Sequence, residues 1–411
     1  PLSLRTIQSE LTPRYKAKND TVELNIGYNI TPALTIISNT GYNNDFLASF
    51  EDFNRFTSRP GIFYSSPTQA GGGPDGSLTG VYGAAFTPGG VLCDPQLGCS
   101  NKFVGEDLSQ EKAFQLSQEV RLVSNFGGPL NFSAGGNYLH YETEENYYVF
   151  INTLTMYAIS GGATVSSLPS PYIPGVTSNI ECVAQNAYLY PVPSEGGGLA
   201  QAVCPYVDPN SISSLNNLGH NYFLSQNPYV LNSYAAFGEA YYSILSDLKL
   251  TAGLRWTEDQ KHFTDIPSEL LANSWGYPST AAVNQQWDQF TGRLNATWMP
   301  KLAITDQTLF YGSYSHGYKA GGANPPGAVL LTTSSSSGDI LNPIHPATFK
   351  PEFIDAFEVG TKNTLADGSL TINADLFYFN YEGYQISEIV DRSAINLNFN
   401  AHVKGAEVEG T

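Results

Sequence analysis

The residue types that most often perform catalysis are scattered along this chain. Its histidines, at 140, 220, 262, 316, 345 and 402, show no pair at the spacing of metal ligands, and we expect each to be structural or solvated. No Ser-His-Asp arrangement or Walker loop is present, and the glycine clusters lack the following helix that phosphate binding needs. The sequence therefore predicts binding or transport, with no enzyme activity, no metal site and no cofactor.

Aromatic residues and one histidine at the bases of long loops form the first group of candidates. Rigid amphipathic rings bind ligands at a low entropic cost, so these side chains could form a binding vestibule. The alternative is an aromatic girdle at a membrane surface. The candidate ligand-binding residues are Tyr147, Tyr148, Trp275, Trp287, Tyr314, His316, Tyr318 and Tyr384.

A second group of polar side chains shares one face of the expected strands. These residues would line a lumen, where they could contact a plug or a passing ligand. For any single residue the simpler interpretation is a cross-strand charge ladder that holds neighbouring strands together. The members of this group are Glu119, Arg121, Glu239, Arg255, Arg293, Glu358, Lys362 and Asp375.

Four cysteines lie in segments rich in Gly, Pro and Ser. Of the three possible connectivities we expect Cys93 with Cys99 and Cys182 with Cys204, because each pair closes a loop within itself. Such disulfides place the loops in an oxidising compartment. A metal site is the alternative, but no Cys-x-x-Cys spacing or nearby histidine supports it.

Strands must position these candidates, and residues 230–263 show the pattern most clearly. After a two-residue turn at Ser246 and Asp247, apolar residues alternate with polar or small ones, at Leu248, Leu250, Ala252, Leu254 and Trp256. Period two predicts a strand with one apolar face. In the preceding arm, Tyr234 and Tyr242 are roughly 26 Å apart along a strand, or about 20 Å in height at a 40° tilt. This height is close to the apolar band of an outer-membrane barrel.

The composition agrees with a wall that faces lipid. Charged residues make up 14% of the chain and aromatic residues 13%, against about 25% charged residues in soluble domains. No apolar run approaches the roughly 18 residues of a membrane helix, so a membrane would have to be crossed by strands. The net charge of -18 argues against a nucleic-acid partner. We attribute the acidity to the solubility of large loops.

Short and long connections between the expected strands alternate along the chain. Tight turns join strands near residues 31–32, 126–129, 246–247, 300–306 and 365–368, whereas long inserts occupy about 43–111, 149–228 and 319–350. Outer-membrane barrels have short periplasmic turns and long extracellular loops, whereas the connections of a sandwich or propeller need not sort by length. We therefore predict an all-β, antiparallel transmembrane barrel.

Several sequence segments resemble the barrel of TonB-dependent outer-membrane receptors of the iron-complex type. They are SQEVRL at 117–122, YGSYSHGYKAGG at 311–322, KPE at 350–352, EVGTK at 358–362, DLFY at 375–378 and GAEVEG at 405–410. The resemblance covers most strands from about Phe114 onward and is specific only in combination. It implies a 22-stranded barrel closed by an N-terminal plug. We count eleven or twelve strands, and we expect residues 1–411 to be one partial barrel domain without the plug and the C-terminal strands.

The resemblance also implies a function and partners. The expected protein is an importer in the outer membrane of a Gram-negative bacterium, which takes up a scarce nutrient, most simply a ferric-siderophore complex. Energy would come from the TonB, ExbB and ExbD complex, through a segment outside this chain. The other expected partners are outer-membrane lipid and lipopolysaccharide. Iron chelate, cobalamin and oligosaccharide stay open as cargo, and the alternatives are a passive porin, a surface scaffold or adhesin, and a secreted glycan-binding β-protein.

Overall fold

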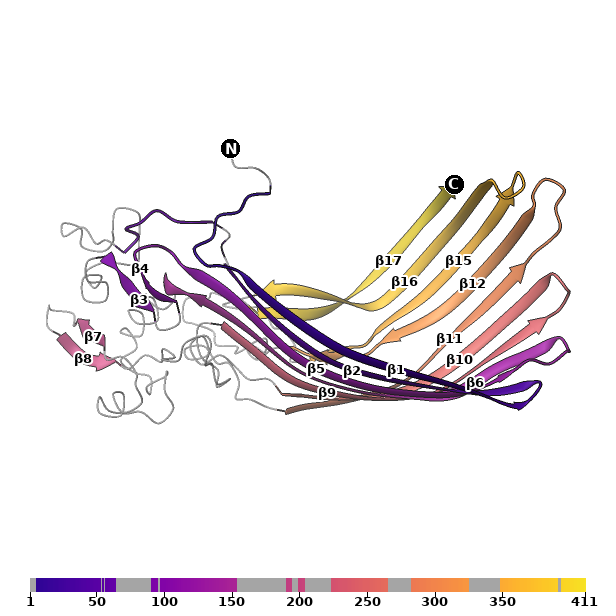
Figure 1. Cartoon of the computed structure of the whole chain (residues 1–411), viewed down its shortest axis with the longest axis horizontal. Helices are drawn as coiled ribbons and strands as arrows, with labels where there is room; N and C mark the ends of the chain where they lie inside the picture. Colours follow the sequence, from indigo (N-terminus) through magenta and orange to yellow (C-terminus); the bar gives the residue numbers. More distant parts are fainter. Residues whose placement is uncertain are drawn as a thin grey trace, which may run out of the picture.

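Eleven long strands form one antiparallel sheet in the computed structural model (Figure 1). The structure describes residues 5–52, 54, 56–63, 90–94, 97–153, 190–193, 199–203, 223–264, 282–324, 348–390 and 393–411. The sheet consists, in its spatial order, of β1 Arg14–Thr31, β2 Leu34–Asp52, β5 Gly105–Ser124, β6 Leu130–Ile151, β9 Phe223–Ser243, β10 Leu248–Thr264, β11 Ala282–Trp298, β12 Gln307–Lys319, β15 Glu352–Leu365, β16 Leu370–Val390 and β17 Ser393–Gly410. Consecutive long strands are neighbours throughout, which confirms the predicted local pairing.

Three two-stranded sheets lie in the long connections. They are formed by β3 Leu92–Asp94 with β4 Gly98–Ser100, by β7 Tyr190–Pro193 with β8 Leu199–Val203, and by β13 Gly322–Ala323 with β14 Thr348–Phe349. Among the described residues, no helix is long and apolar enough to cross a membrane.

The apolar residues of the long strands are exposed rather than packed into a core. On β10 and β16, Leu254 and Leu376 are 59% and 58% exposed, and Leu250 and Ile372 are also exposed. Because neighbouring strands stay in register, these side chains join into one apolar belt that runs along one face of the sheet. The predicted exposure of one apolar face is therefore confirmed, and a continuous apolar face of this kind is typical of a wall that faces lipid.

The strands continue beyond this apolar belt. On the belt face of β10, Trp256 is followed by Glu258, Gln260 and His262, which are polar. We therefore take Leu248 to Trp256 as the membrane-spanning segment of β10. The remainder of the strand lies outside the membrane, on the side of the long connections.

Short connections lie at one end of the sheet and longer ones at the other, as the sequence predicts, with one exception. Residues 32–33, 125–129, 244–247, 299–306 and 366–369 connect the strands at one end of the sheet, where Figure 1 shows the tight turns gathered. The connections at the other end comprise residues 53–104, 152–222, 265–281 and 320–351, and this is the extracellular end. The exception is the connection between β16 and β17 at this end, which comprises only residues 391–392.

Strands near the extracellular end are longer than the sequence predicts. We expected an irregular segment from 43 to about 111, but β2 extends to Asp52 and β5 begins at Gly105. Outside the membrane the belt face no longer has to be apolar, so the alternation fades while the backbone pairing continues.

The largest of the fully buried side chains lie at this extracellular end rather than in the membrane. Phe150, Leu92 and Phe63 are almost completely buried there. Cys93 and Cys99 form the predicted disulfide and link β3 to β4. Cys182 and Cys204 lie outside the described residues.

Lysine substitutions at two adjacent positions of β11 test which face meets lipid. Leu294 is 57% exposed and lies midway along the belt between Phe290 and Trp298. Leu294→Lys should therefore lower the free energy of unfolding by about 2–4 kcal/mol. Asn295→Lys, on the opposite face, should change it by no more than about 0.5 kcal/mol. Urea titration in lipid vesicles measures both, and equal costs would contradict the assignment of faces.

Removing the disulfide should affect only the extracellular hairpin. Cys93 and Cys99 are six residues apart, so the bridge lowers the entropy of a small unfolded loop and contributes about 2 kcal/mol. Cys93→Ser/Cys99→Ser should therefore speed proteolysis between residues 90 and 104. The urea midpoint of the barrel should stay unchanged, because both cysteines are exposed in a separate two-stranded sheet. A lower barrel midpoint would show that the hairpin supports the sheet.

Candidate functional site

The inner face of the sheet, opposite the belt, carries the predicted polar group. Each member has the opposite parity from the exposed apolar residues of its own strand, so all of them point to this face. These residues are Glu119, Arg121, Glu239, Arg255, Arg293, Glu358, Lys362 and Asp375.

One pair in this group bridges across an intervening strand. Arg293 on β11 donates from Nε and Nη2 to the Glu239 carboxylate on β9, at 2.7 and 2.9 Å. Gly253 of β10 lies between them in register, and a Cβ there would be 3.0 Å from Glu239 Oε2. The glycine therefore leaves room for a bidentate pair that ties three strands together, as the ladder interpretation expects.

Other inner-face cations lie over aromatic rings of neighbouring strands. Lys249 Nζ is 4.5 Å from the centroid of the Tyr241 ring, and the Arg255 guanidinium is 5.7 Å from that of Phe237. Lys362 and the Tyr311 ring are 6.0 Å apart. The inner face thus combines positive charge with aromatic faces, a combination that stabilises cations within a partly desolvated lumen.

At the extracellular end of this face, the base of the connection 320–351 folds into a short strap. We define the strap as residues 320–323 and 348–350, which include the paired strands β13 and β14. It requires glycine at two positions. A Cβ at Gly321 would lie 2.3 Å from Phe349 O and 2.9 Å from the Trp287 ring, and one at Gly322 would meet the Phe349 ring.

Side-chain amides from several strands hold the strap in place. Gln385 Nε2 on β16 donates to Ala320 O and Lys350 O, at 3.0 and 3.1 Å. Asn398 on β17 accepts from Lys350 N at 2.8 Å and donates to Lys350 O at 2.9 Å. On the other side, Gln285 of β11 donates to Gly322 O at 3.1 Å. These bonds satisfy backbone groups that have no partner in a regular ladder.

Lys261 joins the strap to an aromatic cluster on the inner face. Its Nζ donates to Gly321 O at 2.7 Å and lies 5.4 Å from the centroid of the Trp287 ring and 6.0 Å from that of Tyr229. Lys261 lies beyond the apolar belt of β10. Burial lowers the pKa of its ammonium, and the nearby Asp259 opposes this shift. An ammonium has three donors, so two remain for an anionic ligand that approaches along the rings.

Three of the predicted ligand-binding residues contact nearby side chains at the loop bases. Tyr147 donates from Oη to Asp107 Oδ2 at 2.8 Å, and Tyr148 is 1% exposed and stacks on Phe150. Tyr384 packs edge-on against Tyr381. Tyr148 is therefore not accessible to a ligand in this conformation.

One more of the predicted residues lies in the upper inner region, since Trp287 belongs to the Lys261 cluster. Tyr318 is paired in register with Phe353 and packs against its ring, with centroids 5.8 Å apart, on the same face as His316. Trp275 lies outside the described residues. Ligand contact by this group stays a prediction.

Tyr314 and His316 do not line the interior, as the predicted binding vestibule would require, and their position fits the alternative of an aromatic girdle. In register, Tyr314 lies opposite Leu294 and Phe357, which belong to the belt face. Both side chains therefore point away from the lumen, and both bond Asp355. Alternation alone did not assign their face, because β12 is rich in Gly and Ser.

Sequence reasoning missed Lys261, Tyr229 and the amides of the strap. Lys261 continues the inner-face parity of Arg255, so extending the alternation beyond the apolar belt would have identified it. No sequence signal marks Gln385 or Asn398. Within the described ranges, no group of three or more His, Cys, Asp or Glu side chains could hold a metal ion.

Comparisons with known proteins agree with this architecture. Residues 184–411 match the family model described as TonB dependent receptor-like, beta-barrel. No curated protein matches the sequence. Among solved structures, the ferric yersiniabactin uptake receptor FyuA from Yersinia pestis has a TM-score of 0.52 at 13% identity, and the alignment covers 97% of this chain and 40% of that receptor. The copper transporter OprC has a TM-score of 0.50 at 11% identity, with 96% and 44% covered.

At these identities the solved structures establish the fold alone, and this chain spans less than half the length of either protein. The family model covers more than half of the chain, including seven of the eleven long strands in full. TonB-dependent receptors are transporters rather than enzymes. The chain belongs to the TonB-dependent receptors and is a β-barrel protein of the Gram-negative outer membrane.

Proposed function

We propose that this chain is part of an active importer that carries a bulky anionic nutrient, a ferric-siderophore complex, through the lumen of the barrel. Family membership supports uptake across the outer membrane. The proposal also includes energy from the TonB, ExbB and ExbD complex, and contact of the belt with outer-membrane lipid and lipopolysaccharide.

The Lys261 cluster carries the assignment of the cargo class. Siderophores hold ferric iron through deprotonated oxygens, often on planar rings, so many of their complexes present negative charge together with flat surfaces. Lys261 offers unused donors beside the Trp287 and Tyr229 rings at the extracellular end of the inner face. A cation flanked by aromatic faces suits such a ligand better than a neutral oligosaccharide.

The inner face below this cluster would provide the path. Arg255, Arg293 and Lys249 lie successively deeper along the lumen, over aromatic rings or beside a carboxylate. Spaced cations of this kind attract an anionic complex, while their existing partners prevent any one of them from retaining it. We propose weak successive contacts below a tighter site at the strap.

Removing the charge of Lys261 should weaken binding of an anionic complex. Lys261→Met retains the length of the side chain but loses its donors, so the Kd for a ferric tris-catecholate should rise about tenfold, since a charged hydrogen bond contributes about 1.5–3 kcal/mol. Lys261→Arg should retain most of the affinity. Lys301→Met, in the turn at the opposite end of the sheet, is the matched control. Quenching of tryptophan fluorescence measures binding, and equal Kd values for both Met variants would contradict the assigned cargo class.

Uptake should depend on TonB. Cells that express the intact receptor should accumulate radioactive ferric complex, and deletion of TonB should abolish accumulation while surface binding persists. A passive porin would give equal uptake in both strains, and a scaffold or adhesin would give none in either.

A further inference from the structure

A second group of polar side chains, unrelated to the lumen, lies on the outer surface of the barrel. His316, Asp355, Asn380 and His402 occupy one row across β12, β15, β16 and β17, because each is paired in register with the next. They share the face of the exposed residues Phe357 and Leu376. The row therefore faces the surroundings of the barrel, not its interior.

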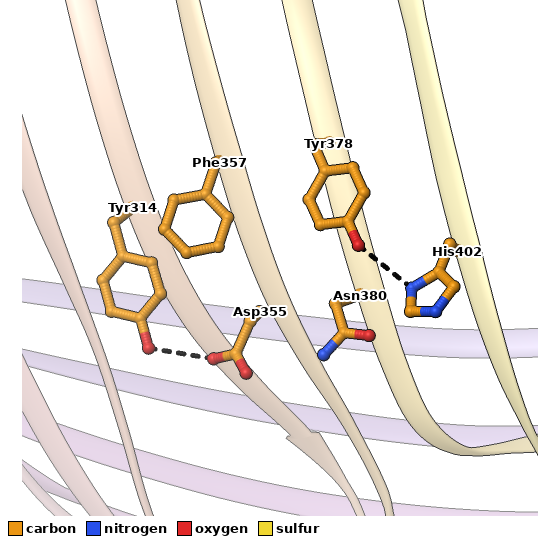
Figure 2. A pocket seen from close by; sticks show the side chains of 6 residues that line it. All are labelled: Tyr314, Asp355, Phe357, Tyr378, Asn380 and His402. Carbon is orange, nitrogen blue, oxygen red and sulfur yellow. Dashed lines mark hydrogen bonds between the residues drawn. The ribbon is translucent and has the colours of Figure 1, made fainter.

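Aromatic side chains form the row directly below. Tyr314, Phe357 and Tyr378 are paired in register two residues closer to the membrane centre, and the next belt residues are Val359 and Leu376. Together with Asp355, Asn380 and His402, these aromatic side chains line a shallow pocket, which Figure 2 shows from close by. The pocket thus lies where the apolar belt ends and the polar surface begins.

Internal contacts fix the orientation of the polar groups. Asp355 Oδ1 accepts from Tyr314 Oη at 2.9 Å and pairs with His316 Nδ1 at 2.8 Å, and the His316 ring stacks on Phe353. His402 Nδ1 lies 3.2 Å from Tyr378 Oη (Figure 2). These bonds use one atom of each group, and the second Asp355 oxygen and the His402 Nε2 remain available.

The middle member of the row completes the site. Asn380 stands between Asp355 and His402, and its amide makes no hydrogen bond with any described residue. An amide offers two donors and an acceptor. The pocket therefore presents a carboxylate oxygen, an amide and an imidazole nitrogen side by side above a floor of aromatic rings.

We propose that this pocket binds the sugar headgroup of an outer-leaflet glycolipid. Adjacent sugar hydroxyls both donate and accept, as Asp355, Asn380 and His402 require, and the apolar face of a pyranose ring can pack on the aromatic floor. A lipid anchored beside the belt presents its headgroup at this height, because the aromatic row marks the membrane surface. Lys404, in register with Tyr378, extends the row toward a phosphate on the sugar.

A phospholipid headgroup suits the pocket less well. Its phosphate would meet the Asp355 carboxylate without a sugar hydroxyl between them, and only Lys404 would attract it. The row on β10 and β11 that follows their last large apolar belt residues is a natural comparison. There Glu258 and Asp288 follow Trp256 and Phe290, without the free amide between a carboxylate and an imidazole.

Lipid titration of the intact receptor in detergent, read by native mass spectrometry, tests this assignment. Asn380→Ala/His402→Ala should raise the apparent Kd for lipid A about tenfold, with no change for phosphatidylglycerol. The matched control, His262→Ala/Gln286→Ala, removes an imidazole and an amide from the same outer face of β10 and β11 and should leave both lipids unaffected. Tyr378→Phe, which removes only the hydroxyl beside His402, should raise the Kd for lipid A about threefold.

Three results would overturn the proposal. Equal affinity of both double variants for lipid A would show that the pocket is not the site. An equal loss for phosphatidylglycerol would show that the sugar is not what is recognised. If the deacylated lipid A headgroup binds as tightly as the intact lipid, the site takes a soluble glycan and not a membrane component. Uptake of the ferric complex should be unchanged in the Asn380→Ala/His402→Ala variant, which separates this site from the transport pathway.

Discussion

Backbone hydrogen bonding in a medium without water is the constraint on which this structure depends. Lipid offers no partners for N–H and C=O groups, so each strand must pair along its whole length. The resulting ladder fixes the face of every side chain, since a slip of one residue would exchange the lipid and lumen faces. The register of the long strands shifts only near Asn29 and near Tyr381, at the ends of the apolar belt. Both irregularities lie where water can reach the backbone.

Outside the membrane the same requirement is met by different means. The strap at the base of the connection 320–351 has little ladder of its own, and its carbonyls are bonded by Lys261, Gln285, Gln385 and Asn398. These contacts account for two of the sequence segments that resemble TonB-dependent receptors. The glycines that end YGSYSHGYKAGG admit Trp287 and Phe349, and the backbone of Lys350 in KPE is the partner of Asn398. The two segments are far apart in the sequence and meet in one structural unit.

The alternation of apolar and polar residues predicted which face of a strand each side chain occupies. It predicted little else about the structure. Faces were assigned correctly on β10 and β16, where apolar and polar residues alternate. They were not assigned on β12, because Gly312, Ser313, Ser315 and Gly317 leave no contrast between faces, and Tyr314 and His316 therefore appeared as lumen candidates. The sequence did not predict that β2 extends to Asp52 and that β5 begins at Gly105. Backbone pairing continues there beyond the end of the apolar alternation. The strap depends on contacts between residues 35 or more positions apart, which a single sequence does not encode visibly.

The charged groups of the inner face contribute less to stability than their number suggests, and this suits a transport path. Although Arg293 and Glu239 form a bidentate pair, the arginine side chain is 59% exposed. At that exposure water screens the pair, and its contribution is about 1 kcal/mol or less. The ladder of backbone bonds and the lipid-facing belt already hold the strands together. Inner-face charges can therefore exchange partners with a passing ion at a small cost, whereas a deeply buried pair could not.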